Sequence, residues 1–196
     1  MKRLLFLPLA ASFCLPAFGA TITCLTNNSG ECATLAGDLS IMGSNANLTI
    51  SNIGPLESEI DAIYFDTTGT PITGIVIGAS AGTVTFGLGA NPANLPAGNT
   101  ATPAFVSSFA IQAANGNTPR IGVGESLTVS ATGGDLGTIF NAGSIRVGLH
   151  VQSVGTTGNS ESVVGQFSPV PEPTSALLVG VGICLVALSR KKLKRT

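Results

Sequence analysis

Few residues in this sequence could carry out chemistry, and the first is His150, its only histidine. Alternation along the surrounding segment places His150 on the polar face of a strand. A Ser/His/Asp arrangement would need Ser160 or Ser162 as the nucleophile and an acid such as Asp135. No nucleophile-elbow motif is present. We therefore interpret His150 as an ordinary polar-face residue, with an exported hydrolase as the weaker alternative.

A second candidate is a run of carboxylates. Glu57, Glu59 and Asp61 fall on one strand face, and Asp66 follows shortly after. Several carboxylates together with backbone carbonyls could hold Ca²⁺. Their spacing matches no EF-hand loop, and acids are common on a solvated strand face. The solvated face is the favoured interpretation and a calcium site the alternative, so we expect no metal or other cofactor.

The cysteines suggest a covalent link. Of four cysteines, Cys14 lies in an N-terminal apolar run and Cys184 in a C-terminal one. The remaining pair, Cys24 and Cys32, flank a turn-prone Asn-Asn-Ser-Gly segment. In an oxidising compartment we expect them to form a disulfide that contributes about 2–3 kcal/mol. A two-cysteine metal site is the rival, but no histidine or third cysteine lies nearby in the sequence.

The elements that must position these residues resemble short strands. Period-two alternation with β-branched and aromatic residues is typical of strands, and Gly- and Pro-containing turns separate the segments. The strand-like segments are 47–53, 57–65, 72–77, 83–88, 105–111, 127–131 and 145–151. Seven to nine such strands predict a mostly β protein with a single antiparallel β-sandwich domain over residues 20–168. A closed barrel is the alternative.

The alternation also predicts which side chains share a face, and no segment before Ala176 shows a sustained helical period. The residues expected to lie together are Leu48 with Ile50, Ile63 with Phe65, Ile60 with Tyr64, Phe105 with Ile111, Phe86 with Leu88, and Val147 with Leu149 and Val151.

The N-terminal end reads as a signal peptide. Met1-Lys2-Arg3 is a charged n-region, residues 4–15 are apolar, and small residues follow. Cleavage after Gly19 would place Ala17 and Gly19 at the positions that a signal peptidase recognises. We therefore expect residues 1–19 to be a signal helix that is removed on export.

Charge is distributed unevenly along the chain. Residues 20–168 contain nine acidic residues and only two basic ones, Arg120 and Arg146, which gives this segment a formal charge of −7. Phosphate binding needs clustered Lys and Arg. The composition therefore argues against nucleic acid as a partner.

The C-terminal end combines three features. Residues 169–175 form a proline-rich linker with the motif Pro171, Glu172, Pro173. Residues 176–189 form an apolar helix, shorter than the usual span of about 20 residues but extended by cations that can snorkel. Residues 190–196 form a basic tail, which holds this end in the cytoplasm by the positive-inside rule. The cations that set this topology are Arg190, Lys191, Lys192, Lys194 and Arg195.

In this order, Val170 to Ser175, the apolar span and the cluster Arg190 to Arg195 closely resemble the PEP-CTERM sorting signal of Gram-negative bacteria. The resemblance implies processing by an exosortase, a membrane-embedded cysteine transpeptidase-like enzyme. It implies that Pro171, Glu172 and Pro173 are recognised and that the span is discarded or exchanged. The family is linked to extracellular polysaccharide and the biofilm matrix.

These features predict an exported protein, first anchored by one helix in the inner membrane with its domain in the periplasm, then sorted to the cell surface or matrix. Its predicted role is structural or interactive and not enzymatic. The expected partners are signal peptidase, an exosortase, the inner membrane and, in one version, exopolysaccharide. The alternatives are a carbohydrate-binding module of the matrix, an exported hydrolase and a permanently inserted single-span protein.

Overall fold

We describe residues 20–114 and 119–167 of a computed structural model of the chain. The predicted signal peptide, sorting motif, membrane span and basic tail all lie outside these residues. Within them, no helix has both the length and the apolar character needed to cross a membrane.

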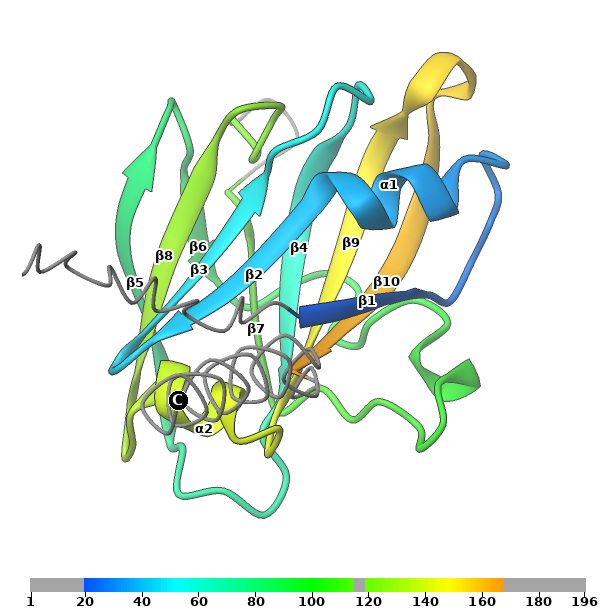
Figure 1. Cartoon of the computed structure of the whole chain (residues 1–196). Coiled ribbons are helices and arrows are strands. Elements are labelled where there is room, and N and C mark those ends of the chain that lie inside the picture. Colours follow the sequence, from blue (N-terminus) through cyan, green and yellow to red (C-terminus); the bar gives the residue numbers. More distant parts are fainter. Residues whose placement is uncertain (1–19, 115–118, 168–196) are drawn as a thin grey trace, which may run out of the picture. The chain divides into compact units, whose positions relative to one another are not determined.

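The described residues form a mostly β domain with two antiparallel sheets (Figure 1). Sheet A contains, in spatial order, β1 (Ala20–Cys24), β10 (Asn159–Phe167), β9 (Arg146–Val154), β4 (Glu59–Asp66), β7 (Phe109–Ala113) and β6 (Phe86–Leu88). Sheet B contains β2 (Leu39–Ser44), β3 (Asn47–Asn52), β8 (Ser126–Thr132) and β5 (Gly74–Ala81). Short 3₁₀ turns, η1 (Gly98–Thr100) and η2 (Gly155–Thr157), lie in the connections.

The two sheets share one hydrophobic core, as in a β-sandwich. Leu48 and Ile50 enter it from sheet B, and Val147, Leu149 and Val151 enter it from sheet A; all five are fully buried. This agrees with the predicted alternation, because only one face of each strand is lined with large apolar side chains. The mostly β, two-sheet part of the prediction is therefore confirmed.

Strand β4 departs from strict alternation. Its pairing with β9 shifts register between Ile60 and Ala62, which is a β-bulge. The bulge turns Ile60 into the core beside Ile63 and Phe65, whereas Tyr64 lies on the opposite face. The prediction that Ile60 and Tyr64 share a face is therefore wrong, because alternation does not reveal an inserted residue.

The outer face of sheet A is also covered. The connection between β6 and β7 folds over it and places Leu95 and Phe105 against Tyr64 and Val164. Phe105 therefore belongs to this second cluster and Ile111 to the main core, contrary to the prediction, and the strand begins only at Phe109. Leu88, expected to be buried with Phe86, is 74 % exposed at the end of the short β6.

Two short helices, which alternation did not predict, close the domain: α1 (Cys32–Asp38) and α2 (Leu136–Asn141). Each is less than two full turns, too short for a 3.6-residue period to be seen. Both are held by packing, since Leu35, Leu136 and Phe140 are fully buried.

The predicted disulfide is present between Cys24 and Cys32, with their Cα atoms 6.1 Å apart. It joins the end of β1 to the start of α1. Glu161, on the neighbouring β10, accepts hydrogen bonds from the hydroxyls of Thr26 and Ser29 at 2.6 and 2.7 Å. Burial alone would raise the pKa of Glu161, but hydrogen bonds from Ser29 and Thr26 outweigh it and lower the pKa.

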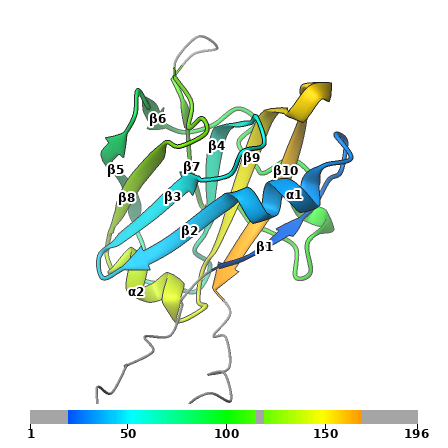
Figure 2. The same ribbon diagram turned by 45° about the horizontal axis from the view of Figure 1, so that its top comes forward.

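The two ends of the described domain lie together. β1 and β10 are neighbours in sheet A, and Ala20 pairs with Phe167. Directly paired residues of antiparallel strands have Cα atoms about 4.5–5.5 Å apart. The predicted mature N-terminus therefore lies beside the residue that leads into the linker (Figure 2).

Candidate functional site

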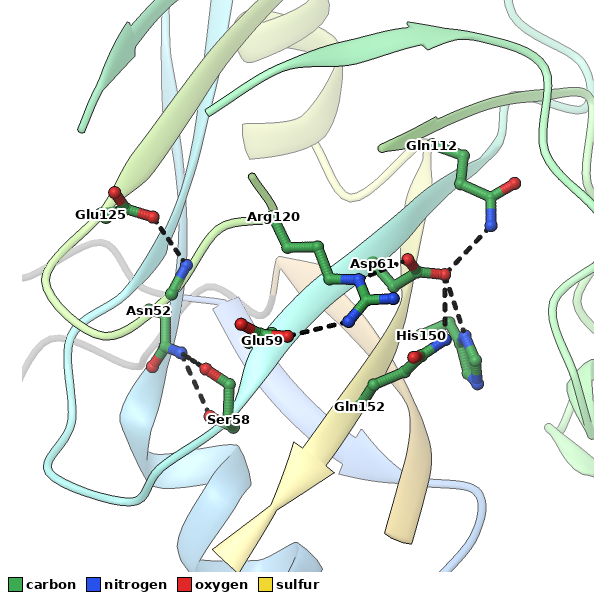
Figure 3. Close-up of polar contacts among 10 residues, drawn as sticks. Asn52, Ser58, Glu59, Asp61, Gln112, Arg120, Glu125, His150 and Gln152 are labelled. Atoms are coloured by element: carbon green, nitrogen blue, oxygen red, sulfur yellow. Dashed lines mark hydrogen bonds and ion pairs between the residues drawn. The ribbon is translucent and has the colours of Figure 1, made fainter. Parts of the chain in front are cut away.

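Polar side chains from several elements come together on the outer face of sheet A, where six residues form what we call the Asp61 cluster (Figure 3). They come from β4, β7, β9 and the segment before β8, and all have a polar group within 4 Å of another member. The members are Glu59, Asp61, Gln112, Arg120, His150 and Gln152.

Asp61 is the centre of this cluster. One carboxylate oxygen, Oδ1, accepts a hydrogen bond from Arg120 Nε at 2.8 Å. The other, Oδ2, accepts from Gln112 Nε2 at 3.0 Å and from Gln152 Nε2 at 3.1 Å. Asp61 is only 6 % exposed, so the solvated strand face predicted for it is wrong. The bulge after Ile60 explains this, because it carries Asp61 to the crowded middle of the sheet face.

Arg120 bridges the two carboxylates. Its Nη1 donates to Glu59 Oε2 at 2.8 Å, and the Glu59 side chain is 44 % exposed. Burial alone would lower the pKa of Arg120. Its hydrogen bonds to Glu59 and Asp61 raise the pKa by more than burial lowers it, so the net shift is upward. Arg120 therefore stays positively charged between these two side chains.

Asn52 fixes the strand that carries the cluster. Its side chain is fully buried and donates to the carbonyl and hydroxyl oxygens of Ser58 at 2.9 and 3.1 Å. Its backbone N–H donates to the carbonyl of Glu125 at 3.1 Å (Figure 3). This holds the crossing from β3 in sheet B to β4 in sheet A, immediately before Glu59.

His150 belongs to the cluster but makes no hydrogen bond to Asp61, because its Nδ1 lies 3.8 Å from Asp61 Oδ2. Burial lowers its pKa, Asp61 opposes this, and Arg120 lowers the pKa further. The imidazole is therefore neutral at pH 7. Burial of the Tyr64 hydroxyl, with a smaller contribution from Asp61, raises the pKa of Tyr64 to about 12. The hydroxyl of Tyr64 donates to the carbonyl of Pro92 at 3.0 Å.

The two serines named for the hydrolase alternative differ in exposure, since Ser162 is buried and Ser160 is half-buried. Ser162 on β10 pairs directly with His150 on β9, and it is 1 % exposed. A nucleophile must reach its substrate. The acid named for that alternative, Asp135, lies next to α2, whereas the carboxylate beside His150 belongs to Asp61. The serine that pairs with His150 is therefore inaccessible to a substrate, whereas Ser160 is not.

The carboxylates named for the calcium alternative do not form a common site. The structure separates them: Glu59 and Asp61 bind Arg120, whereas Asp66 binds Arg146. Burial would raise the pKa of Asp66, but hydrogen bonds from Arg146, Thr68 and Val106 lower it overall. Across residues 20–114 and 119–167, no three His, Cys, Asp or Glu side chains are grouped as a metal site requires.

A cavity of about 320 Å³ opens beside Arg146, at the start of β9. Arg146 also donates to the carbonyls of Pro103 and Ala104, and its guanidinium lies 5.4 Å from the centre of the Phe105 ring. The Arg146 guanidinium therefore binds the β6–β7 connection and holds it against sheet A. The lining residues include Asp66, Thr68, Ser144 and Gln166.

Comparisons of the chain with protein-family models, curated proteins and solved structures found no match. The sorting residues Pro171, Glu172 and Pro173 and the topology residues 190–195 lie outside the described residues. Sequence reasoning missed the roles of Arg120, Gln112 and Gln152. One signal was available for Arg120, because a domain with two arginines and nine acids has few cations with which to pair a buried acid.

Proposed function

We propose that this protein is exported, held briefly by a C-terminal helix in the inner membrane, and sorted by an exosortase to the cell surface or extracellular polysaccharide matrix. There it has a structural or interactive role and no catalytic one. The observation that carries the proposal is the order of features in residues 169–195: the Pro171-Glu172-Pro173 motif, an apolar segment and a basic cluster.

Two properties of the domain support this proposal. The Cys24–Cys32 disulfide suits an oxidising compartment outside the cytoplasm. The pairing of Ala20 with Phe167 places both ends of the domain at one point. A signal peptidase and an exosortase acting near the same membrane could therefore cut both flanking segments without unfolding the domain.

Expression of the chain with an internal epitope tag tests the proposal directly. In a host that contains an exosortase, we expect the mature protein in the surface or medium fraction and without residues 176–196 by intact mass. In an isogenic host that lacks the exosortase, the same chain should remain in the membrane at full mature length. Persistence of the intact tail in both hosts would refute sorting and favour a permanent single-span protein.

Replacing Glu172 by Gln tests the motif with a minimal change. The variant removes one carboxylate and leaves both prolines and the apolar span in place. We expect it to accumulate in the membrane, whereas Glu161→Gln, which weakens a buried clamp in the domain, should lower stability without blocking cleavage. Equal processing of Glu172→Gln and the unaltered chain would remove the glutamate from the recognised motif.

A carbohydrate-binding module of the matrix is the second candidate, and the Asp61 cluster favours it. Carboxylate, amide and guanidinium groups lie together on one sheet face, and Glu59 and Arg120 are both partly exposed. Against it, the hydrogen-bonding groups largely satisfy one another. Retention of the chain on purified exopolysaccharide, lost in Glu59→Gln, would establish this role, and no retention on any polysaccharide tested would exclude it.

A further inference from the structure

The two sheets end in four edge strands among the described residues, and these edges are protected unequally. β1 carries the disulfide to α1 and packs against that helix. β2 contacts α1, α2 and β1. β6 has only three residues. Coverage and shortness are two ways in which proteins prevent edge strands from pairing with other chains.

β5 lacks these protections. It is eight residues long, reads Gly-Ile-Val-Ile-Gly-Ala-Ser-Ala, and contains no charge and no proline. Within residues 20–114 and 119–167, no helix is among its main neighbours, which are β8 in its own sheet and β6 and β7 in the facing one. A bulge between Ile77 and Ser80 interrupts its pairing with β8, so Gly74–Ile77 is the regular part of the edge.

The charge distribution isolates this edge further. From Thr67 to Pro119 the sequence contains no charged residue, and this span includes β5, β6 and β7. All nine acids of the domain lie elsewhere. Near β5, the acid Glu125 does reach this span: its carboxylate accepts a hydrogen bond from the N–H of Thr83 at 3.0 Å, beyond the end of β5.

Exposure along β5 is correspondingly high. Val76 points away from the core and is 46 % exposed, whereas Ile75 is buried. Every residue from Gly78 to Thr83 is exposed. Val76 is directly paired with Ser130 of β8, so its exposed side chain lies on the uncharged outer face of sheet B, at the edge.

We propose that β5 is a self-association edge, at which Gly74–Ile77 pairs antiparallel with the same segment of a second copy and joins two B sheets into one. The occupant is a second copy because the charges select it. Two domains of formal charge −7 repel each other over their acidic surfaces, whereas the uncharged β5, which among the described edges is neither covered by a helix nor short, lets two copies meet without opposing like charges. An antiparallel pairing is also self-complementary, as a two-fold interface requires.

A lysine at Val76 tests this pairing in the full-length chain. Pairing around a two-fold axis would place two introduced lysines close together, and edge lysines oppose strand addition. We expect sedimentation velocity to show a reversible dimer for the unaltered chain and a dissociation constant at least about tenfold larger for Val76→Lys. Association through the apolar tail would be unaffected by this substitution, so the two modes are distinguishable.

Met42→Lys is the matched control. Met42 lies on the other edge strand of sheet B, and at 55 % it is about as exposed as Val76. We expect its dimer to equal that of the unaltered chain. A monomeric unaltered chain, equal dimerisation of Val76→Lys and the unaltered chain, or equal loss in both lysine variants would each overturn the proposal.

Crosslinking provides a measurement that does not depend on the lysine variant folding. With Cys184 replaced by Ser in both variants of the mature chain, a short bismaleimide should join two copies of Val76→Cys and leave Met42→Cys mostly uncrosslinked at the same concentration. A reversed preference, or equal crosslinking at both positions, would contradict pairing through β5. Capture of Val76→Cys only by a different protein would assign the edge to another partner and likewise overturn self-association.

Discussion

Replacing Arg120 by Gln should separate a buried electrostatic contribution from an exposed one. The substitution keeps a polar side chain but removes the cation that binds both Asp61 and Glu59. Asp61 would then remain in a site where its side chain is 8 % exposed. Its only remaining side-chain donors in the cluster would be Gln112 and Gln152.

The structure sets the expected size of this effect. Removing one partner of a fully buried ion pair costs about 3–5 kcal/mol. Arg120 is 20 % exposed and two amide donors stay in place, so we expect a loss of about 2–3 kcal/mol in the free energy of unfolding. Glu59 is 44 % exposed, and Glu59→Gln should therefore cost less than about 1 kcal/mol.

Urea unfolding of the purified, oxidised protein, followed by circular dichroism, measures these differences. The double variant Arg120→Gln/Asp61→Asn should recover part of the loss, with a coupling energy of about 1 kcal/mol or more. If Arg120→Gln cost no more than Glu59→Gln, Asp61 would not depend on the cation and the reasoning would be wrong.

Three further outcomes are expected. Reduction of the disulfide should lower the free energy of unfolding by about 2.5 kcal/mol, measured as a shift in the urea midpoint, and an unchanged midpoint would contradict the loop-entropy argument. Gly133→Ala should be more destabilising than Gly158→Ala by about 1–2 kcal/mol; both have positive φ, but a Cβ at Gly133 would meet the backbone carbonyl oxygen of Pro71 whereas at Gly158 the space is open, so equal losses would count against that clash. The pKa of His150 is lowered in the fold, so its contribution to stability is complete above about pH 6.5 and is lost as the pH falls through that lowered pKa. His150→Gln should flatten the dependence of the urea midpoint on pH between about 7 and 5, and an unchanged slope would show that His150 does not titrate there.

Alternation predicted the strands whose two faces differ. In β3 and β9 one face enters the core and the other is polar, so Leu48, Ile50, Val147 and Leu149 could be assigned from sequence. β10 was not predicted, because residues Glu161 to Gly165 are all buried and leave no alternation. The cover over the outer face of sheet A accounts for part of that burial.

The Asp61 cluster was only partly predictable. The carboxylates and His150 could be named from sequence, but Arg120 lies 59 residues from Asp61 along the chain. Gln112 and Gln152 are separated from Asp61 by 51 and 91 residues. Such contacts depend on strand order and register, and the bulge in β4 that turns Asp61 toward them has no local signature.

The pairing of Ala20 with Phe167 has a mechanical consequence. A domain tethered through residue 167 receives all load from its anchor through β10, which lies between β1 and β9. A pull along β10 would slide this strand against both neighbours and strain many ladder hydrogen bonds at once. The same closeness of the ends means that a short linker from Phe167 to Ala20 should give a circularly permuted domain with new ends at an exposed turn.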